Sequence, residues 1–386
     1  MAVSRGGGAA STPAPHHGTP LLLPALISLP GGTPAVAMVT EFPPPKAELQ
    51  VAVQTLDAMS AKPTDRYKAF CAVVIDTGTG HIRSGLAGDE EPRSVVPSQA
   101  GGSPILTHGV VTNWDGLEEL WHRIIYQELC VCPEEVAVLA TDAPLSPFTD
   151  REKMAELLFE GFGVPAMLVL PRSLLATYSH GRTSGVVVGS GAGTSYAAAV
   201  QEGYVLPHAT FRLDVAGDAL TLYLDQLLKS RGVHLDTYSL CHLKETCCCA
   251  LPGIGRPQPV SPPSISGLLQ EDEWFHCPEM LLAPTALGLP GPGLLEQVSH
   301  SLCCCGAPPG SPATRLLLAG GTTLLRGFPQ RLSAELGVLV EAAPRRRAAA
   351  WLGGSLVASL DAFQGAWVPR DAYEEGGPAI VHSYCC

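Results

Sequence analysis

Residues 73–98 read VVIDTGTGHIRSGLAGDEEPRSVVPS, and the rest of the chain is best interpreted from this stretch. A run of strand-forming residues ends at the glycine-rich turn DTGTG, and a second such run begins just after it. This pattern predicts a strand, a tight turn and a returning strand. Because glycine lets the backbone turn sharply with its N–H groups pointing inward, such a turn is a candidate anion site.

Two further glycine-rich turns follow strand-like runs later in the chain. Residues 185–193 read GVVVGSGAG, and residues 316–323 read LLLAGGTT. A single turn of this kind is weak evidence, but the first two turns form a weak internal repeat. The repeat predicts two related halves whose turns face each other and form a nest of N–H groups for a polyphosphate.

Strands and amphipathic helices alternate between these turns. The clearest helix is expected at residues 117–129, where apolar side chains recur on one face, with Asp115 as its candidate N-cap. This alternation predicts an α/β fold. The other expected elements are strands at residues 136–140 and 166–170 and helices at residues 150–162 and 174–179.

The charge balance restricts the class of partner. The formal net charge is −12 and the isoelectric point is about 5.4, which argues against direct binding of nucleic-acid phosphates. Residues 345–347 (RRR) form a compact basic run, which is interpreted as a solvated loop. The sequence has no apolar run long enough to span a bilayer, and residues 21–29 are not interpreted as a secretory signal.

Low-complexity and cysteine-rich segments complete the outline. Residues 1–66 are rich in alanine, glycine and proline and predict a disordered extension, and residues 251–266 predict a proline-rich loop. The 13 cysteines include the runs 247–249 and 303–305 but no CxxC pair of the kind that holds zinc. They indicate reduced thiols, with lipidation or opportunistic metal binding as the alternatives.

Several longer blocks of sequence accompany the three turns in a fixed order. From residue 73 to the C-terminus the chain resembles a divergent member of the actin family. The resemblance implies the two-lobed α/β fold shared by actin, Hsp70 and sugar kinases, with duplicated ribonuclease-H-like domains that close around ATP and Mg²⁺. The blocks are GVVTNWDGLEELWH, LATDAPLSPFTDREKMAELLFEGFGVPAM, GRTSGVVVGSGAG, EGYVLPHATFRLDVAG, LLLAGGTTLLRGFPQRL and WLGGSLVASLDAFQGAWVPRDAYEEGGPAIVH.

The resemblance also implies domain boundaries. Residues 67–171 with 352–386 would form the first lobe, and residues 172–351 the second. Actins carry a small subdomain, their subdomain 2, where this chain has only residues 99–107, which are expected to be a linker. With this insertion largely missing, we expect the protein not to form actin-type filaments alone.

Many nucleotide-binding positions of actins are matched in this chain. The resemblance implies that ATP or ADP is the candidate cofactor, whereas Mg²⁺ is doubtful because only Asp76 remains to hold it, weakly and through water. Candidate nucleotide-binding residues are Asp76, Gly78, Thr79, Gly80, Arg83, Ser190, Gly191, Lys244, Glu245, Gly320, Gly321, Thr322 and Arg347.

The departures from actins lie on the metal and water side of this site. Arg83 replaces a lysine, which keeps the charge but changes the geometry. Arg172 replaces the glutamine that holds the attacking water, Gly189 and Ala192 replace two aspartates, and Tyr196 replaces a histidine. Losing such groups typically lowers metal affinity roughly 10–100-fold and the rate roughly 10²–10⁴-fold. We therefore expect a pseudo-ATPase without catalytic residues.

These expectations describe an actin-like cytoskeletal or scaffold protein that acts through protein partners. The alternatives are a slow ATP-hydrolysing switch and a nuclear actin-related subunit of a chromatin-remodelling assembly. The expected location is the cytoplasm, in association with the cytoskeleton, with the nucleus as the alternative. A sugar-kinase-like phosphotransferase is disfavoured because the second glycine turn has no catalytic carboxylate.

The resemblance further implies a surface for partners. Actins bind amphipathic helices in an apolar groove, and we expect helices of this type or other cytoskeletal proteins as partners. A purely structural role in the core is the alternative for these positions. The groove candidates are Tyr178, Gly181, Thr183, Leu352, Leu356, Leu360 and Ala366; His108 stands where actins carry a methylatable histidine.

Overall fold

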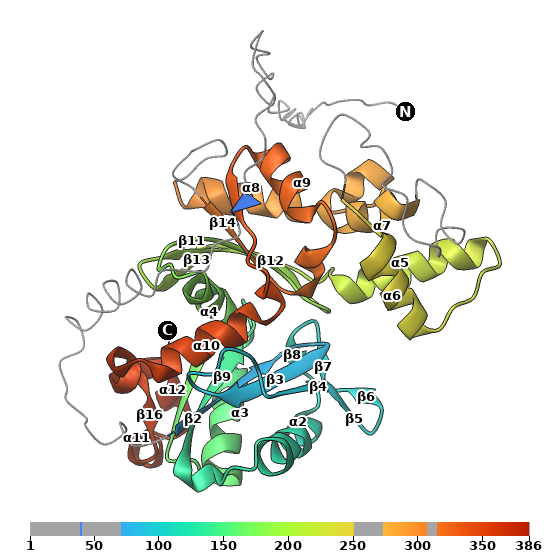
Figure 1. The fold of residues 1–386 in the computed structure, drawn as a ribbon. Helices are drawn as coiled ribbons and strands as arrows, with labels where there is room; N and C mark the ends of the chain where they lie inside the picture. The colour runs from blue at the N-terminus through green and yellow to red at the C-terminus, as the bar shows by residue number, and fades with distance from the viewer. Residues whose placement is uncertain (1–38, 41–70, 251–272, 307–314, 386) are drawn as a thin grey trace, which may run out of the picture. The chain divides into compact units, whose positions relative to one another are not determined.

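The computed structural model describes residues 39–40, 71–250, 273–306 and 315–385 (Figure 1). The expected extension at residues 1–66, apart from Val39–Thr40, and the proline-rich loop at residues 251–266 lie outside the described residues. Within the described residues, the fold is built on two six-stranded sheets with helices around them. The prediction of an α/β fold is confirmed.

The first sheet carries the DTGTG turn. In strand order it consists of β16 (Val368–Pro369), β10 (Ala166–Pro171), β9 (Val136–Asp142), β2 (Cys71–Thr77), β3 (His81–Leu86) and β4 (Ser94–Pro97). Strands β10, β9 and β2 are parallel, and β3 returns antiparallel to β2 after the turn. The parallel strands are almost wholly buried, as expected of a sheet covered on both faces.

The second sheet repeats this arrangement around the GSGAG turn. Its order is β1 (Val39–Thr40), β15 (Leu339–Glu341), β14 (Arg315–Ala319), β11 (Gly185–Ser190), β12 (Ser195–Gln201) and β13 (Tyr204–Leu213). Strands β11 and β12 form the antiparallel hairpin, and β14 and β15 add parallel strands beside β11. The two glycine turns therefore occupy equivalent places, each between a buried strand and its antiparallel partner.

Helices lie in the connections that lead into β9, β10, β11, β14, β15 and β16 (Figure 1). The first of them is capped by Asn113, whose Oδ1 accepts a hydrogen bond from the Gly116 N–H at 2.9 Å, so the expectation of Asp115 as the cap is wrong. Asp115 lies in the first turn, where its negative charge interacts favourably with the helix dipole. The helices are α2 (Trp114–His122), α3 (Phe148–Glu156), α4 (Arg172–Ser179), α5 (Gly217–Ser230), α6 (Thr237–Cys247), α7 (Glu273–Leu282), α8 (Leu294–Cys304), α9 (Phe328–Leu336), α10 (Ala349–Ser359), α11 (Arg370–Gly376) and α12 (Val381–Tyr384).

Strand β11 separates two buried apolar clusters. The side chain of Val187 belongs to the cluster that includes the first sheet, α4 and α10, whereas Val186 and Val188 belong to the cluster around α5, α8 and α9. This alternation follows from the two-residue period of a strand. Trp351 of α10 is fully buried and donates its Nε1–H to the Val74 carbonyl at 3.2 Å, which ties α10 to the first sheet.

The segment expected to be a linker contains short paired strands. β5 (Gln99–Ala100) pairs with β6 (Ser103–Pro104), and β7 (Leu106–Thr107) pairs with β8 (Val110–Val111). Ile105 is fully buried between these pairs, and its carbonyl accepts hydrogen bonds from the N–H groups of residues 112 and 113. Residues 99–107 are thus anchored to the start of α2.

Candidate functional site

The first two glycine turns lie against each other. A Cβ atom placed on Gly193 would lie 2.6 Å from Cγ2 of Thr79, and one placed on Gly80 would lie 2.9 Å from Cβ of Ala192. Real Cβ atoms do not approach so closely, so a larger residue at either glycine would force the turns apart. The structure thus brings together Thr79 and Gly80 of one hairpin with the second turn of the other.

The third turn and helix α5 hold the second turn in place. Thr322 donates its hydroxyl to the Gly191 carbonyl at 2.7 Å, and Gly320, with φ at +89°, packs its Cα against the Ser190 carbonyl. The first N–H groups of α5 also bind this turn, since Gly217 N donates to the Gly191 carbonyl at 3.0 Å. The carbonyls of the second turn are therefore directed toward the protein.

The N–H groups of the two turns remain available to a ligand. Within the part of the chain that the structure describes, the N–H groups of Thr79, Gly80, Ala192 and Gly193 donate no hydrogen bond to the protein. The Gly78 and Gly191 N–H groups, by contrast, donate to carbonyls of their own turns. Unpaired N–H groups on two touching turns form the kind of nest that binds anions.

Asp76, at the end of β2, is already neutralised by protein cations. Its Oδ1 accepts hydrogen bonds from Thr141 Oγ1 at 2.8 Å and from Arg172 Nε at 3.1 Å, and Oδ2 lies 3.9 Å from Arg83 Nη1. Arg172 also donates Nη2–H to the Thr77 carbonyl. The Asp76 side chain is only 8% exposed, so little of it is left for another ligand.

These surroundings do not fit a Mg²⁺ ion. A magnesium site needs several oxygen ligands and water, and it normally carries negative charge. Around Asp76 the guanidinium of Arg172 supplies positive charge instead, and the described residues contain no group of three histidine, cysteine, aspartate or glutamate side chains that could hold a metal. The weak expectation of metal binding at Asp76 therefore has no support in the geometry.

Tyr196 fills the space beside Gly189. The two residues are direct cross-strand partners in the β11–β12 hairpin. A Cβ atom on Gly189 would overlap the tyrosine ring and lie 2.6 Å from its hydroxyl oxygen. Burial raises the pKa of Tyr196 well above its ordinary value, so the phenol is neutral. Gly189 and Tyr196 thus pack directly against each other, whereas the sequence analysis treated the missing aspartate and the missing histidine as two separate replacements.

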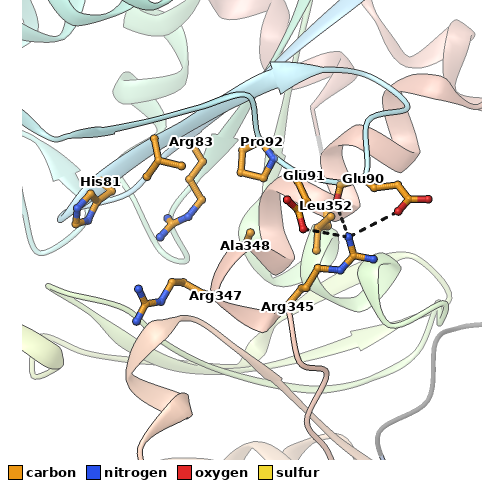
Figure 2. Close-up of a pocket in the computed structure, with 10 residues that line it drawn as sticks. His81, Arg83, Glu90, Glu91, Pro92, Arg345, Arg347, Ala348 and Leu352 are labelled. Carbon is orange, nitrogen blue, oxygen red and sulfur yellow. Dashed lines mark hydrogen bonds and ion pairs between the residues drawn. The ribbon is translucent and has the colours of Figure 1, made fainter. Parts of the chain in front are cut away.

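A cavity of about 440 Å³ lies next to the turns (Figure 2). Its walls carry His81 and Arg83 from β3, and Arg345 and Arg347 from the turn before α10. Figure 2 shows Arg83 and Arg347 on opposite walls of this cavity. Burial and, next, the charges of Arg83 and Arg347 lower the pKa of His81, so its imidazole is uncharged at neutral pH.

The expectation that residues 345–347 form a solvated loop is wrong for Arg346, whereas the side chains of Arg345 and Arg347 are 53% and 52% exposed. Arg346 is buried and donates from Nε to Thr323 Oγ1 at 3.1 Å. Arg345 closes one end of the cavity, where its Nη1 donates to the Glu90 carbonyl at 2.8 Å. The three arginines are thus used for packing, for a connection to the β3–β4 segment and for the cavity wall. The sequence offers no signal for this, because the partners lie far away along the chain.

The predicted Lys244–Glu245 pair is divided between two roles. Lys244 is buried, and its Nζ donates to the Gly217 carbonyl and to Thr221 Oγ1, both at 2.7 Å. Its charge is therefore used to join α6 to α5. Glu245 is exposed, and its Oε2 lies 3.5 Å from Arg347 Nη2, beside the cavity; Gly321 also packs near Arg347.

The predicted groove residues do not share one environment. Tyr178 is 1% exposed, and its ring packs edge-on to Phe363 at 5.8 Å. Leu352 lines the cavity of Figure 2. Gly181 is buried and Thr183 half-buried, while the last three residues are half-buried apolar side chains packed on the core: Leu356, Leu360 and Ala366.

His108 connects the short paired strands to the second glycine turn. Its Nδ1 lies 2.9 Å from the Gly193 carbonyl oxygen, and its own carbonyl accepts a hydrogen bond from Arg212 of β13. The histidine therefore has a structural role in this chain.

Among the described residues, no helix is both long enough and apolar enough to cross a membrane.

Comparison with known proteins places these features in a family. The family model described as Actin matches residues 102–247 and 266–386. The chain is 37% identical to Actin-like protein 7B of Homo sapiens over 374 residues, which cover 81% of this chain and 88% of that protein. It is also 37% identical to Actin-like protein 7A of Homo sapiens over 379 residues, which cover 85% of this chain and 87% of that protein.

Proposed function

The chain belongs to the actin family, and from this premise we propose that it is an actin-like scaffold that does not hydrolyse ATP. The observation that carries the proposal is the contact of Arg172 with Asp76 at 3.1 Å. In actins a glutamine at the position of Arg172 holds the attacking water. A guanidinium cannot accept a proton from water. The Arg172 guanidinium is bound to the Asp76 carboxylate and to the Thr77 carbonyl, so it does not hold the attacking water.

Tyr196 supports the same proposal from the opposite hairpin. Actins have an aspartate at the position of Gly189 and a histidine at the position of Tyr196. The buried tyrosine ring fills the space of the former, and its raised pKa prevents it from acting as a base at neutral pH. The groups that hold water and metal in actins are thus replaced here. Arg172 carries a positive charge that repels a metal, and the Tyr196 ring fills the space beside Gly189.

The short segment at residues 99–107 supports a protein that does not polymerise alone. In actins the corresponding subdomain provides part of the contact along the filament. Here the nine residues form only the β5–β6 pair and strand β7, which pairs with β8, and Ile105 between them is buried, so the segment holds no structure of subdomain size for such a contact. We place the protein in the cytoplasm with the cytoskeleton, acting through bound proteins; a slow nucleotide switch and a nuclear remodelling subunit are the alternatives.

Purified full-length protein in a polymerising buffer with Mg²⁺-ATP is expected to release phosphate no faster than buffer alone. We expect a rate at least roughly 10²-fold below that of actin, because the water-positioning groups are missing. Single-turnover phosphate release measures this, and sedimentation of the same samples is expected to yield no helical filaments. Filament-forming actin is the positive control. Turnover at the rate of actin would exclude the scaffold proposal and favour the switch.

The half-buried residues of α10 and the segment after it are the proposed partner surface. Leu356→Asp is expected to abolish partner binding, because a charge would be placed on an apolar contact surface. Leu222→Asp is the matched control, since Leu222 is a 64% exposed leucine on α5. Co-purification from native tissue, followed by mass spectrometry, compares the two variants with the wild type. If a folded Leu356→Asp variant retained the wild-type partners, this surface would be excluded.

A further inference from the structure

We propose that Arg172 takes the place of the divalent metal in this protein, so that the cleft binds the phosphate chain of a nucleotide as the free anion, without Mg²⁺. The inference rests on the proposed function and specifies what its site binds. In the family the metal accompanies the phosphates; here the residues present do not fit a metal but do fit an anion.

The charge at the metal position is positive before any ligand binds. Arg172 and Arg83 both contact Asp76, at 3.1 and 3.9 Å, so one carboxylate meets two guanidinium groups. Arg172 and Asp76 are 13% and 8% exposed at their side chains, so solvent screens this charge only partly. The surplus positive charge is what a metal ion would otherwise supply to a phosphate chain.

The two glycine turns and the neighbouring cavity offer further groups that attract an anion. Unpaired N–H groups of Thr79, Gly80, Ala192 and Gly193 lie on the touching turns, within the part of the chain that the structure describes. The cavity of Figure 2 begins at the next residue, His81, and adds Arg83 and Arg347 on facing walls. The positive surplus lies at Asp76, where two arginines meet one carboxylate. The other arginines of the cavity are paired, Arg347 with Glu245 and Arg345 with Glu90 and Glu91.

A magnesium-bound nucleotide fits this site less well than the free anion. Magnesium removes two negative charges from the phosphate chain, which weakens its attraction to the arginines. The ion itself would lie near the Arg172 guanidinium, and neither Gly189 nor Ala192 offers a carboxylate to hold it. Added Mg²⁺ should therefore compete with the protein for the nucleotide.

Isothermal titration calorimetry of the full-length protein with ATP, in EDTA and in excess Mg²⁺, tests the proposal. We expect binding in EDTA and at least tenfold weaker affinity in excess Mg²⁺. Binding that requires Mg²⁺, or no binding in either buffer, would overturn the inference. Sodium tripolyphosphate is titrated in parallel, and equal affinity for it and for ATP would overturn the assignment to a nucleotide.

Two variants that each remove one positive charge identify the residue responsible. Arg172→Gln is expected to lower the affinity for metal-free ATP at least tenfold and to remove the inhibition by Mg²⁺. Arg123→Gln is the matched control, because Arg123 is a 49% exposed arginine that pairs with Glu128 and does not line the cavity; its affinity should change less than threefold. Equal losses in both variants would refute a specific role for Arg172. The comparison of buffers with wild-type protein decides the main point even if Arg172→Gln does not fold.

Phosphate release is measured in the same samples to separate this inference from the proposed function. Turnover of ATP would contradict the proposed scaffold function. Absence of both turnover and binding would contradict only the metal-free nucleotide site.

Discussion

Gly189→Ala is expected to destabilise the protein by about 3 kcal/mol, as overpacking of a filled core does. The added methyl group would overlap the ring of Tyr196, which is buried and paired directly across the hairpin. Chemical denaturation of the wild type and the variant, monitored by circular dichroism, measures the difference in the free energy of unfolding. Gly191→Ala is the control, because a Cβ atom there would meet only the Thr194 carbonyl oxygen, at 3.8 Å.

A double-mutant cycle isolates the contact between the two residues. Tyr196→Ala alone is expected to cost about 3–5 kcal/mol through the cavity that it leaves. In that background Gly189→Ala should cost less than about 1 kcal/mol, because the ring that it overlaps is gone. Additive effects of the two substitutions would contradict the packing described here. The cycle thus tests whether the tyrosine occupies the place of the aspartate that actins carry.

Gly353→Ala is expected to destabilise the protein by about 3 kcal/mol or more, because α10 crosses α4 at this residue. A Cβ atom on Gly353 would overlap the Leu175 carbonyl oxygen, which is backbone and cannot move without shifting α4. The penalty acts against the higher helix propensity of alanine, which alone would favour the substitution by about 1 kcal/mol. Thermal and chemical unfolding measure the effect.

Gly354→Ala is the neighbouring control for this crossing. Its Cβ atom would lie 2.8 Å from a methyl group of Val74, a side-chain atom that can move, so a smaller loss is expected. Equal losses at the two glycines would show that close packing of α10 in general, and not its crossing with α4, is responsible. The crossing matters for the site because α4 begins at Arg172 and the turn before α10 carries Arg347.

Local sequence patterns predicted most of the elements around the site. Residues 71–76 and 185–190 form strands because β-branched residues dominate them, and the turns after them follow from their glycines. The cap of α2 was mispredicted, since Asn113 and Asp115 are both good capping residues and only the backbone geometry chooses between them. The burial of Arg346 within the basic run was missed because its partner Thr323 is distant in the sequence.

The sequence by itself determined the family, and it predicted the loss of the water- and metal-holding groups. Arg172, Gly189 and Tyr196 can be read at their positions without coordinates, because residue identity within a matched block is local information. Only the tertiary structure decided what these replacements do. Arg172 meets Asp76 from 96 residues away because the parallel strands β2, β9 and β10 end at one edge of the sheet, and Tyr196 meets Gly189 because the hairpin register pairs them. The physical reason is that strand register and helix crossing set such contacts, so Arg172 forms an ion pair with Asp76 and the Tyr196 ring fills the space beside Gly189.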